Sequence, residues 1–522
     1  MTQMTQMTLM TRLMAASVAL MSVTAQAPTS AAQEPDPHAA VPAASAKSGD
    51  KADKGDKPKP ELPKLPADST TRHSLALPGR TLNFNATAGT IKLTDAETGA
   101  PRADVAFIAF KQVDADPKSR PVAFVFNGGP GYASAWLNLG ALGPWRLAMD
   151  GDAVRPSASA AVSDNAQTWL DFTDLVFLDP PGTGYSRVTG DKDAQKSFYS
   201  VSGDIDALAA TIRRWSEANE RMLSPKFVVG ESYGGFRAPK IAHKLQTEQG
   251  VGVNGLVLVS PVLDFGSFYA SNSVMGLAAR LPAMAATARE RKGPLTREAM
   301  RDVEEYASGA FISDLMRGPN DEAAVARLAA KVAELTGLDA ALVKQQGGRV
   351  SPSTFAREAN RADKKVSSMY DGNVTGLDPA PFAVNTYADD QLRLGLHAPL
   401  IQAMVDIYHR RLNWTVEGGR YLFFNEAANN QWDFGKKGAP DAVNDLKDAL
   451  ALDPGMRVLV AHGFTDLVTP YYESKLVLDQ VPLTGPNGRL KLQVYPGGHM
   501  MYARDGSRAA LHDDAKALVE GK

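Results

Sequence analysis

The feature that most constrains the fold of this chain is a short apolar run leading into a serine between glycines. Residues 227–229 are Phe-Val-Val, an apolar and β-favouring run typical of a strand buried on both faces of a parallel sheet. Gly-Glu-Ser-Tyr-Gly follows, ending at Gly234, and a helix-compatible stretch covers 237–246. This G-x-S-x-G pattern predicts a sharp strand-to-helix turn whose glycines relieve backbone crowding. The turn would present the Ser232 hydroxyl near a helix N-terminus, which favours developing negative charge.

The length and composition are sufficient for one large core plus an insertion, or for two domains. The chain has 522 residues, 44% of them hydrophobic, and a formal net charge of −2. A near-neutral chain without a basic stripe gives no indication of nucleic-acid binding. There is no cysteine, which excludes disulfides, thiol catalysis, cysteine-ligated metal and a lipobox anchor. We expect neither a cofactor nor a metal ion.

The first 27 residues have the pattern of an export signal. Arg12 supplies a positive charge, residues 13–23 form a short apolar core, and Ala-Gln-Ala ending at Ala27 is a small-residue cleavage pattern. Because a proline follows Ala27, cleavage after Ala32 is the alternative, and an uncleaved hydrophobic N-terminus is another. No later apolar run is long enough to span a bilayer, so we expect no stable membrane insertion after cleavage.

Residues 28–70 are rich in alanine, proline, lysine and aspartate. Such a segment buries too little apolar surface to offset its ordering entropy, so we interpret it as a disordered linker. Export without cysteines favours a bacterial protein of the periplasm or the extracellular space.

Apolar runs alternate with helical patterns along much of the chain. A helical periodicity covers 200–217 and directly precedes the serine turn. Such alternation predicts a mostly parallel central sheet with right-handed crossovers and helices on both faces. The runs that we interpret as strands are 102–111, 121–126, 175–178, 227–229, 255–260, 456–461 and 490–495.

The composition of the sequence changes after residue 268. Residues 269–345 are rich in alanine, arginine, glutamate and leucine, with amphipathic patterns at 298–307 and 323–335. We expect a cap insertion at 269–435 that forms a mainly helical layer over the carboxyl ends of the strands. The core would then consist of two parts, 71–268 and 436–522.

A serine hydroxyl needs a base to take its proton, and the chain offers eight histidines. His499 follows two glycines after a predicted strand and completes the order Ser…Asp…His. Asp466 lies in the loop after the preceding strand, where it would fix the tautomer of His499 and stabilise the imidazolium. His462 is the rival base, but it ends the strand before Asp466 and is expected to point into its own loop.

A tetrahedral intermediate also needs preorganised N–H donors for its negative charge. The N–H of Tyr233, directly after the predicted nucleophile, is one candidate. The loop Asn-Gly-Gly-Pro-Gly at 127–131 can supply another, because glycines let backbone approach a substrate. A plain Gly-Pro turn is the alternative interpretation of that loop.

Four motifs in this order, at 127–131, 177–186, 230–235 and 498–500, make the chain resemble the serine carboxypeptidases of family S10. The resemblance covers roughly residues 100–270 and 440–505. It implies an α/β-hydrolase fold with a helical cap insertion. It also implies hydrolysis of C-terminal peptide bonds through an acyl-enzyme, with peptides bearing a free C-terminus as the partners.

The same resemblance assigns roles to individual residues. The implied catalytic triad is Ser232, Asp466 and His499. The implied oxyanion hole is formed by the N–H groups of Gly129 and Tyr233. The implied site for the substrate carboxylate consists of Asn127, Gly128 and Glu231.

The chain departs from the family in three places. Residues 132–134 are Tyr-Ala-Ser where eukaryotic members have cysteines, and the linker at 28–70 is unusually long. Counted without gaps from Asn127, Ala141 stands where many members have a second glutamate. The missing carboxyl bears on the strength and pH range of carboxylate recognition and leaves the hydrolytic machinery intact.

Glu231 is the residue that separates a carboxypeptidase from a general hydrolase. Two like charges would repel, so we expect burial and the substrate carboxylate to raise the pKa of Glu231 until it holds a proton. It could then donate a hydrogen bond beside Asn127. The alternative is that Glu231 only supports the turn.

Two other functions remain open from the sequence. One is another serine hydrolase on the same fold, such as an acyltransferase, an esterase or a proline-releasing aminopeptidase. In that aminopeptidase family Gly-Gly-Pro-Gly usually follows a histidine, and the Glu231-Ser-Tyr triplet favours a carboxypeptidase. The other is a binding protein with a relic site, which the complete Ser/Asp/His set disfavours. The sequence sets neither the side-chain preference nor the oligomeric state.

Overall fold

The computed structural model describes residues 62–269, 273–384, 389–435, 440–482 and 488–522. Every described residue belongs to one compact unit, 40–522. The predicted signal at 1–27 and the predicted linker up to residue 61 lie outside the described residues. In the described part of the chain, no helix has the length and apolar character needed to cross a membrane.

The end of the predicted linker is attached to the sheet. The first strand begins at Ser69, two residues before the expected boundary. The backbone N–H of Thr90 donates a 3.1 Å hydrogen bond to the Asp68 carboxylate, and Leu65 packs against the hydrophobic core. These contacts tie residues before Ser69 to the folded unit.

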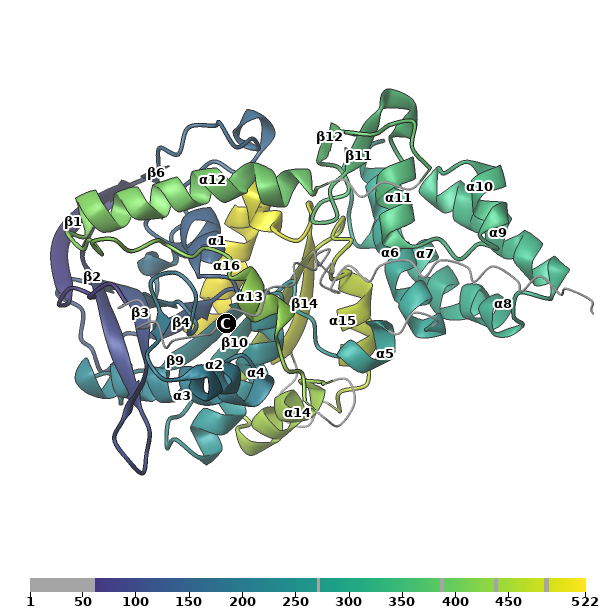
Figure 1. The fold of residues 1–522 in the computed structure, drawn as a ribbon. Helices are drawn as coiled ribbons and strands as arrows, with labels where there is room; N and C mark the ends of the chain where they lie inside the picture. The colour runs from purple at the N-terminus through teal and green to yellow at the C-terminus, as the bar shows by residue number, and fades with distance from the viewer. Residues whose placement is uncertain (1–61, 270–272, 385–388, 436–439, 483–487) are drawn as a thin grey trace, which may run out of the picture. The chain divides into compact units, whose positions relative to one another are not determined.

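Ten strands of the described residues form one sheet in the order β1-β2-β3-β7-β4-β9-β10-β13-β14, with β8 paired to β3 (Figure 1). Pairing is antiparallel from β1 to β7 and parallel from β7 to β14. The expectation of a mostly parallel central sheet is therefore confirmed. The strands are β1 Ser69–Leu77, β2 Arg80–Thr94, β3 Pro101–Gln112, β4 Val122–Phe126, β7 Asp174–Leu178, β8 Arg187–Val188, β9 Lys226–Glu231, β10 Gly255–Val259, β13 Arg457–Gly463 and β14 Leu490–Tyr495.

Apolar side chains cover both faces of the parallel strands. In β4, Phe124 points into one hydrophobic cluster and its neighbour Val125 into the other, as the two-residue repeat of a strand requires. Both faces need helices to exclude water, and both have them. One face is covered by α3 Val201–Ala218, α4 Tyr233–Thr247 and α14 Val443–Leu452. The other is covered by α1 Ala135–Leu137, the π-helical turn η1 Asn138–Leu142, α12 Gln391–Asp406 and α16 Asp505–Glu520.

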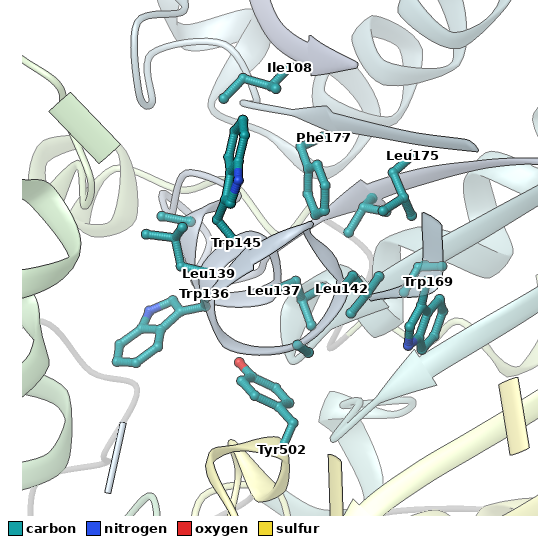
Figure 2. Packing of buried hydrophobic residues seen from close by; sticks show 14 of the residues in the cluster. Ile108, Trp136, Leu137, Leu139, Leu142, Trp145, Trp169, Leu175, Phe177 and Tyr502 are labelled. Atoms are coloured by element: carbon teal, nitrogen blue, oxygen red, sulfur yellow. The ribbon is translucent and has the colours of Figure 1, made fainter. Parts of the chain in front are cut away.

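Large aromatic side chains fill the second of these faces (Figure 2). Trp145 contacts Phe110 edge-on, with ring centroids 5.6 Å apart. Figure 2 shows Tyr502 in the same cluster as Trp136 and Leu137, so the cluster reaches the chain just after His499. Shorter elements at this edge and elsewhere are β5 Trp145–Arg146, β6 Ser163–Asp164, η2 Gly151–Ala153, η3 Trp169–Asp171, α2 Lys192–Phe198, η7 Ile407–Arg411, α13 Glu426–Asn430 and η8 Met501–Ala503.

Between β10 and β13 the chain is mainly helical and has a hydrophobic cluster of its own. This cluster includes Phe464, Leu467, Tyr471 and Tyr472, which follow the carboxyl end of β13. The helices of the insertion therefore pack onto a loop at that end of the sheet and onto α15 Tyr471–Leu478. The elements are α5 Phe265–Tyr269, α6 Val274–Glu290, η4 Glu298–Met300, α7 Arg301–Tyr306, η5 Ala307–Phe311, α8 Ile312–Met316, α9 Glu322–Thr336, α10 Ala340–Gln345, α11 Pro352–Glu358 and η6 Arg361–Asp363, followed by the strand pair β11 Lys365–Ser367 and β12 Thr375–Leu377.

One helix of the predicted cap shares a hydrophobic cluster with the sheet. Leu392, Leu396 and Leu400 of α12 lie in the same hydrophobic cluster as side chains of β4 and β7. The span 269–435 thus contains both helices with a separate hydrophobic cluster and a helix that shares the cluster on one face of the sheet.

Candidate active site

Ser232 occupies the turn between β9 and α4 with a backbone φ of 60°. A non-glycine residue rarely adopts a positive φ, and here close packing of the turn enforces it. A Cβ on Gly230 would lie 2.0 Å from the Gly234 carbonyl oxygen, so a side chain there is excluded. The N–H of Ser232 donates a 2.9 Å hydrogen bond to the carbonyl of Val259 at the end of β10. The half-buried Ser232 side chain thus sits at the carboxyl end of the parallel strands.

The predicted base and acid are in direct contact. His499 Nδ1 lies 2.8 Å from Asp466 Oδ2, and both side chains are buried. Asp466 Oδ1 accepts hydrogen bonds from the N–H groups of Val468 and Thr469 at 2.9 and 3.0 Å. With Nδ1–H donated to this carboxylate, Nε2 of His499 is the nitrogen left to accept a proton.

A serine of the neighbouring strand connects the turn to the histidine loop. Ser260 directly follows β10, its N–H donates to the Ala461 carbonyl, and its hydroxyl donates to the His499 carbonyl at 2.8 Å. Ser232 and His499 are thereby held against the same residue pair, Val259 and Ser260. The structure gives Ser232 Oγ no hydrogen bond to a described residue, so the contact with Nε2 is not formed in it.

The charge state of His499 is set by opposing effects. Burial disfavours the imidazolium, but the charge and hydrogen bond of Asp466, helped by Glu231 and Asp390, outweigh it and raise the pKa of His499. His462, the rival base, is fully buried and its Nε2 lies 2.8 Å from the Ser474 hydroxyl. Burial lowers the pKa of His462 to about 4. Its hydrogen bond is therefore to α15 and not to the serine turn.

The Asn-Gly-Gly-Pro-Gly loop lies against the first residue of α4. A Cβ on Gly128 would be 2.5 Å from the Tyr233 nitrogen, so glycine is required for this approach. Gly129 has a φ of 105°, which favours glycine. Neither the N–H of Gly129 nor that of Tyr233 donates to an acceptor among the described residues. Two free donors therefore lie beside Ser232.

Glu231 and Asn127 form a buried pair next to the serine. Asn127 Nδ2 donates to Glu231 Oε2, and the Tyr502 hydroxyl donates to Oε1 at 2.7 Å. Only 3% of Glu231 and 1% of Asn127 is exposed. Burial raises the pKa of Glu231 to about 7, against the lowering effects of His499, Tyr502 and Asn127. The Glu231 carboxyl can therefore gain or lose a proton near neutral pH.

The motif at 177–186 organises the loop that carries Asn127. The Asp179 carboxylate accepts 2.8 Å hydrogen bonds from both the N–H and the hydroxyl of Ser134. Burial raises the pKa of Asp179 to about 6, and these two donors favour its charged form. The Ser186 hydroxyl donates to the Asp179 carbonyl at 2.6 Å, and this hydrogen bond joins the end of the motif to its aspartate. The second motif is thereby linked to the first.

Four residues at the site escaped the sequence analysis. The Thr469 hydroxyl lies 2.7 Å from Asp466 Oδ2 and 3.0 Å from His499 Nδ1. Tyr370, from the insertion, stacks edge-on against His499 with centroids 5.2 Å apart, and its carbonyl accepts from the His499 N–H. Thr469 lies three residues after Asp466, which was a usable signal, whereas nothing near Tyr370 in sequence indicated its position. The other two are Ser260 and Tyr502.

The fold and the strand–serine–helix turn define the class of the protein as an α/β-hydrolase. Over residues 78–507 the chain matches the family described as serine carboxypeptidase. The chain belongs to the serine carboxypeptidase family, S10, as the four motifs implied.

Individual relatives share short stretches with the chain. Serine carboxypeptidase-like 33 of Arabidopsis thaliana is 25% identical over 169 residues, which is 30% of this chain and 33% of that protein. The pheromone-processing carboxypeptidase KEX1 of Yarrowia lipolytica is 32% identical over 153 residues, 29% of this chain and 23% of that protein. These alignments span a third or less of the relatives' length. In fold, the chain is similar to the prohormone-processing carboxypeptidase KEX1(delta)p of Saccharomyces cerevisiae, with a TM-score of 0.51, 16% identity, and coverage of 84% of this chain and 90% of that one.

Proposed function

We propose that this chain is an exported serine carboxypeptidase that removes residues from the C-termini of peptides through an acyl-enzyme. The observation that carries the proposal is the buried Glu231–Asn127 pair directly beside Ser232. A carboxypeptidase must bind a carboxylate one residue beyond the scissile bond, and a buried carboxyl that can hold a proton beside the nucleophile suits that task. Family membership supports the same activity.

In the proposed reaction Ser232 Oγ attacks the last peptide carbonyl while Nε2 of His499 takes the hydroxyl proton. Asp466 stabilises the resulting imidazolium through the 2.8 Å contact at Nδ1. The N–H groups of Gly129 and Tyr233 stabilise the oxyanion, since both are preorganised and lack an acceptor among the described residues. His499 then protonates the leaving amine. Water, activated by the same histidine, releases the acyl group from Ser232.

Recognition of the free C-terminus is assigned to Glu231 and Asn127. Glu231 has a pKa of about 7 because it is buried, so it carries a proton over the acidic range. A protonated carboxyl can donate to the substrate carboxylate, and the approach of that second negative charge favours the protonated form further. Asn127 Nδ2 provides the second donor. Gly128 permits the approach, since any side chain there would collide with the Tyr233 nitrogen.

The remaining parts of the proposal concern location and the insertion. The signal-like pattern at 1–27 favours export to the periplasm or the outside of a bacterial cell. The insertion at 269–435 would shape specificity, and the contact of Tyr370 with His499 supports this role.

Product analysis by mass spectrometry tests the proposed activity. The purified protein is incubated with one peptide in two forms, blocked at the N-terminus and ending in either a free acid or an amide. We expect stepwise loss of C-terminal residues from the free acid, and much slower cleavage of the amide. Cleavage inside the peptide, or hydrolysis of esters without any loss of C-terminal residues, would contradict the proposal.

A further inference from the structure

Tyr502 is held in one orientation by its surroundings. It lies in η8 (Met501–Ala503), three residues after His499, and its side chain is fully buried. A Cβ on Gly140 would lie 2.5 Å from the Tyr502 ring, so the ring packs directly against the backbone of η1. Arg508 Nη1 donates to the Tyr502 carbonyl at 3.1 Å. Figure 2 shows the ring within the aromatic cluster, on the side where Trp136 and Leu137 lie.

The hydroxyl of this ring has one described partner, Glu231 Oε1, at 2.7 Å. Oε2 of the same carboxyl takes the donor of Asn127. Each oxygen of Glu231 therefore has its own neutral donor, one from the loop after β4 and one from η8, which follows β14. Ala141, buried in the turn against which Tyr502 packs, brings no carboxyl to this site.

Charged groups face Glu231 from two other elements. His499, after β14, favours the ionised form, and Asp466, after β13, favours the protonated form. Tyr132, directly after the glycine loop, also interacts electrostatically with Glu231. In the described part of the chain, no second carboxyl shares a hydrogen bond with Glu231.

We propose that Tyr502 is a positioning residue of the carboxylate subsite, whose phenol fixes Oε1 of Glu231 so that Oε2 faces Asn127 and the incoming peptide carboxylate. This inference rests on the proposed carboxypeptidase activity. Burial beside Glu231 raises the pKa of Tyr502 well above its usual value, so the phenol stays a donor over the whole working range. Recognition of the C-terminus then depends on the protonation of Glu231 alone, and not on two carboxyls that share a proton.

The sign of the effect follows from the direction of the hydrogen bond. A donor to Oε1 favours the ionised carboxylate, so Tyr502 lowers the pKa of Glu231 relative to burial alone. Without the hydroxyl, Glu231 would hold its proton to higher pH. The form that binds a substrate carboxylate would then persist to higher pH as well.

The test is the pH profile of kcat/KM for Tyr502→Phe, which keeps the ring. For peptides with a free C-terminus, we expect the alkaline limb to move up by about 0.5–1 pH unit, as loss of one hydrogen bond predicts. The profile for the matching amide or ester follows His499 and should not move. Tyr495→Phe is the matched control, because it removes a buried phenol that donates to Asp514 at 2.6 Å, away from the site.

A second variant tests the same hydrogen bond without removing it. Replacement of Tyr502 by 3,5-difluorotyrosine makes the phenol a stronger donor, so the alkaline limb should move down. A free-acid profile identical to wild type in both variants would overturn the inference, as would an equal shift in the amide profile. Failure of the proposed function is distinguishable, because the wild-type protein itself would then show no activity that depends on a free C-terminus.

Discussion

The carbonyl oxygen of Asn127 accepts a 2.7 Å hydrogen bond from Nη1 of Arg237. Arg237 lies in α4, the helix that begins after Ser232, and its Nε donates to the Asp204 carboxylate of α3 at 2.6 Å. Both members of this ion pair are buried, with 0% and 1% of their side chains exposed. One guanidinium therefore joins the glycine loop to the two helices behind the nucleophile.

Arg237→Ala should destabilise the protein strongly. The substitution leaves the Asp204 charge buried without a cation, which costs about 3–5 kcal/mol. Arg213→Ala, on α3, is the control, because its ion pair with Glu217 is partly exposed to solvent and surface pairs contribute about 0–1 kcal/mol. The measurement is the free energy of unfolding in denaturant. An equal loss of unfolding free energy in the two variants would show that the buried Arg237–Asp204 pair does not stabilise the protein more than a surface pair does.

Ser232→Ala should abolish turnover and leave the fold intact, because the turn accommodates a smaller side chain. A fluorophosphonate probe should label the wild-type protein at Ser232, and peptide mapping by mass spectrometry identifies the site. The variant should show no labelling and an unchanged melting temperature. Labelling of another serine would contradict the assignment of the nucleophile.

Asp466→Asn should lower kcat by about 10⁴-fold, since an amide at this position favours the wrong tautomer of the histidine. His462→Ala should retain most of its kcat, because His462 Nε2 contacts Ser474 and not the serine turn. Steady-state kinetics on a peptide substrate compares the two with His499→Ala. If His462→Ala proved as damaging as His499→Ala, the base would have been assigned wrongly.

The sequence predicted the elements whose signals are local. The strand, the serine and the helix at 226–247 follow from glycines and apolar residues that are adjacent in the chain, and the parallel sheet follows from the repeated alternation. Boundaries moved slightly: the helix expected at 298–307 begins as a 3₁₀ turn at Glu298–Met300 and continues as α7. Such ends depend on packing that a single segment does not encode.

Several long-range contacts at the site could not be predicted from the sequence. Tyr370 contacts His499 from more than a hundred residues away, through an insertion whose helices carry only a general amphipathic pattern. Tyr502 is close to His499 in sequence, but its partner Glu231 comes from another strand. Likewise the leucines of α12 share a hydrophobic cluster with side chains of β4 and β7, and an apolar helical face does not identify its partner.

The pH dependence should separate the two substrate classes. Glu231 has a pKa of about 7, so kcat/KM for a free-acid peptide should fall as pH rises through that value and the carboxyl loses its proton. Activity on an ester or amide needs only neutral His499, so it should rise with pH and persist. Glu231→Gln keeps a donor without the charge and should flatten the first curve while leaving the second nearly unchanged. Superimposable curves for both substrates and both proteins would show that Glu231 does not read the C-terminus.

Recognition of a free C-terminal carboxylate by Glu231 and Asn127 is tested most directly by one ratio. It is kcat/KM for an N-blocked dipeptide with a free C-terminus divided by that for its amide, measured near pH 6. Hydrogen bonds to a charged group contribute about 1.5–3 kcal/mol, so we expect a ratio of about 10 to 100 in favour of the acid. A ratio near one, or a preference for the amide, would contradict this expectation.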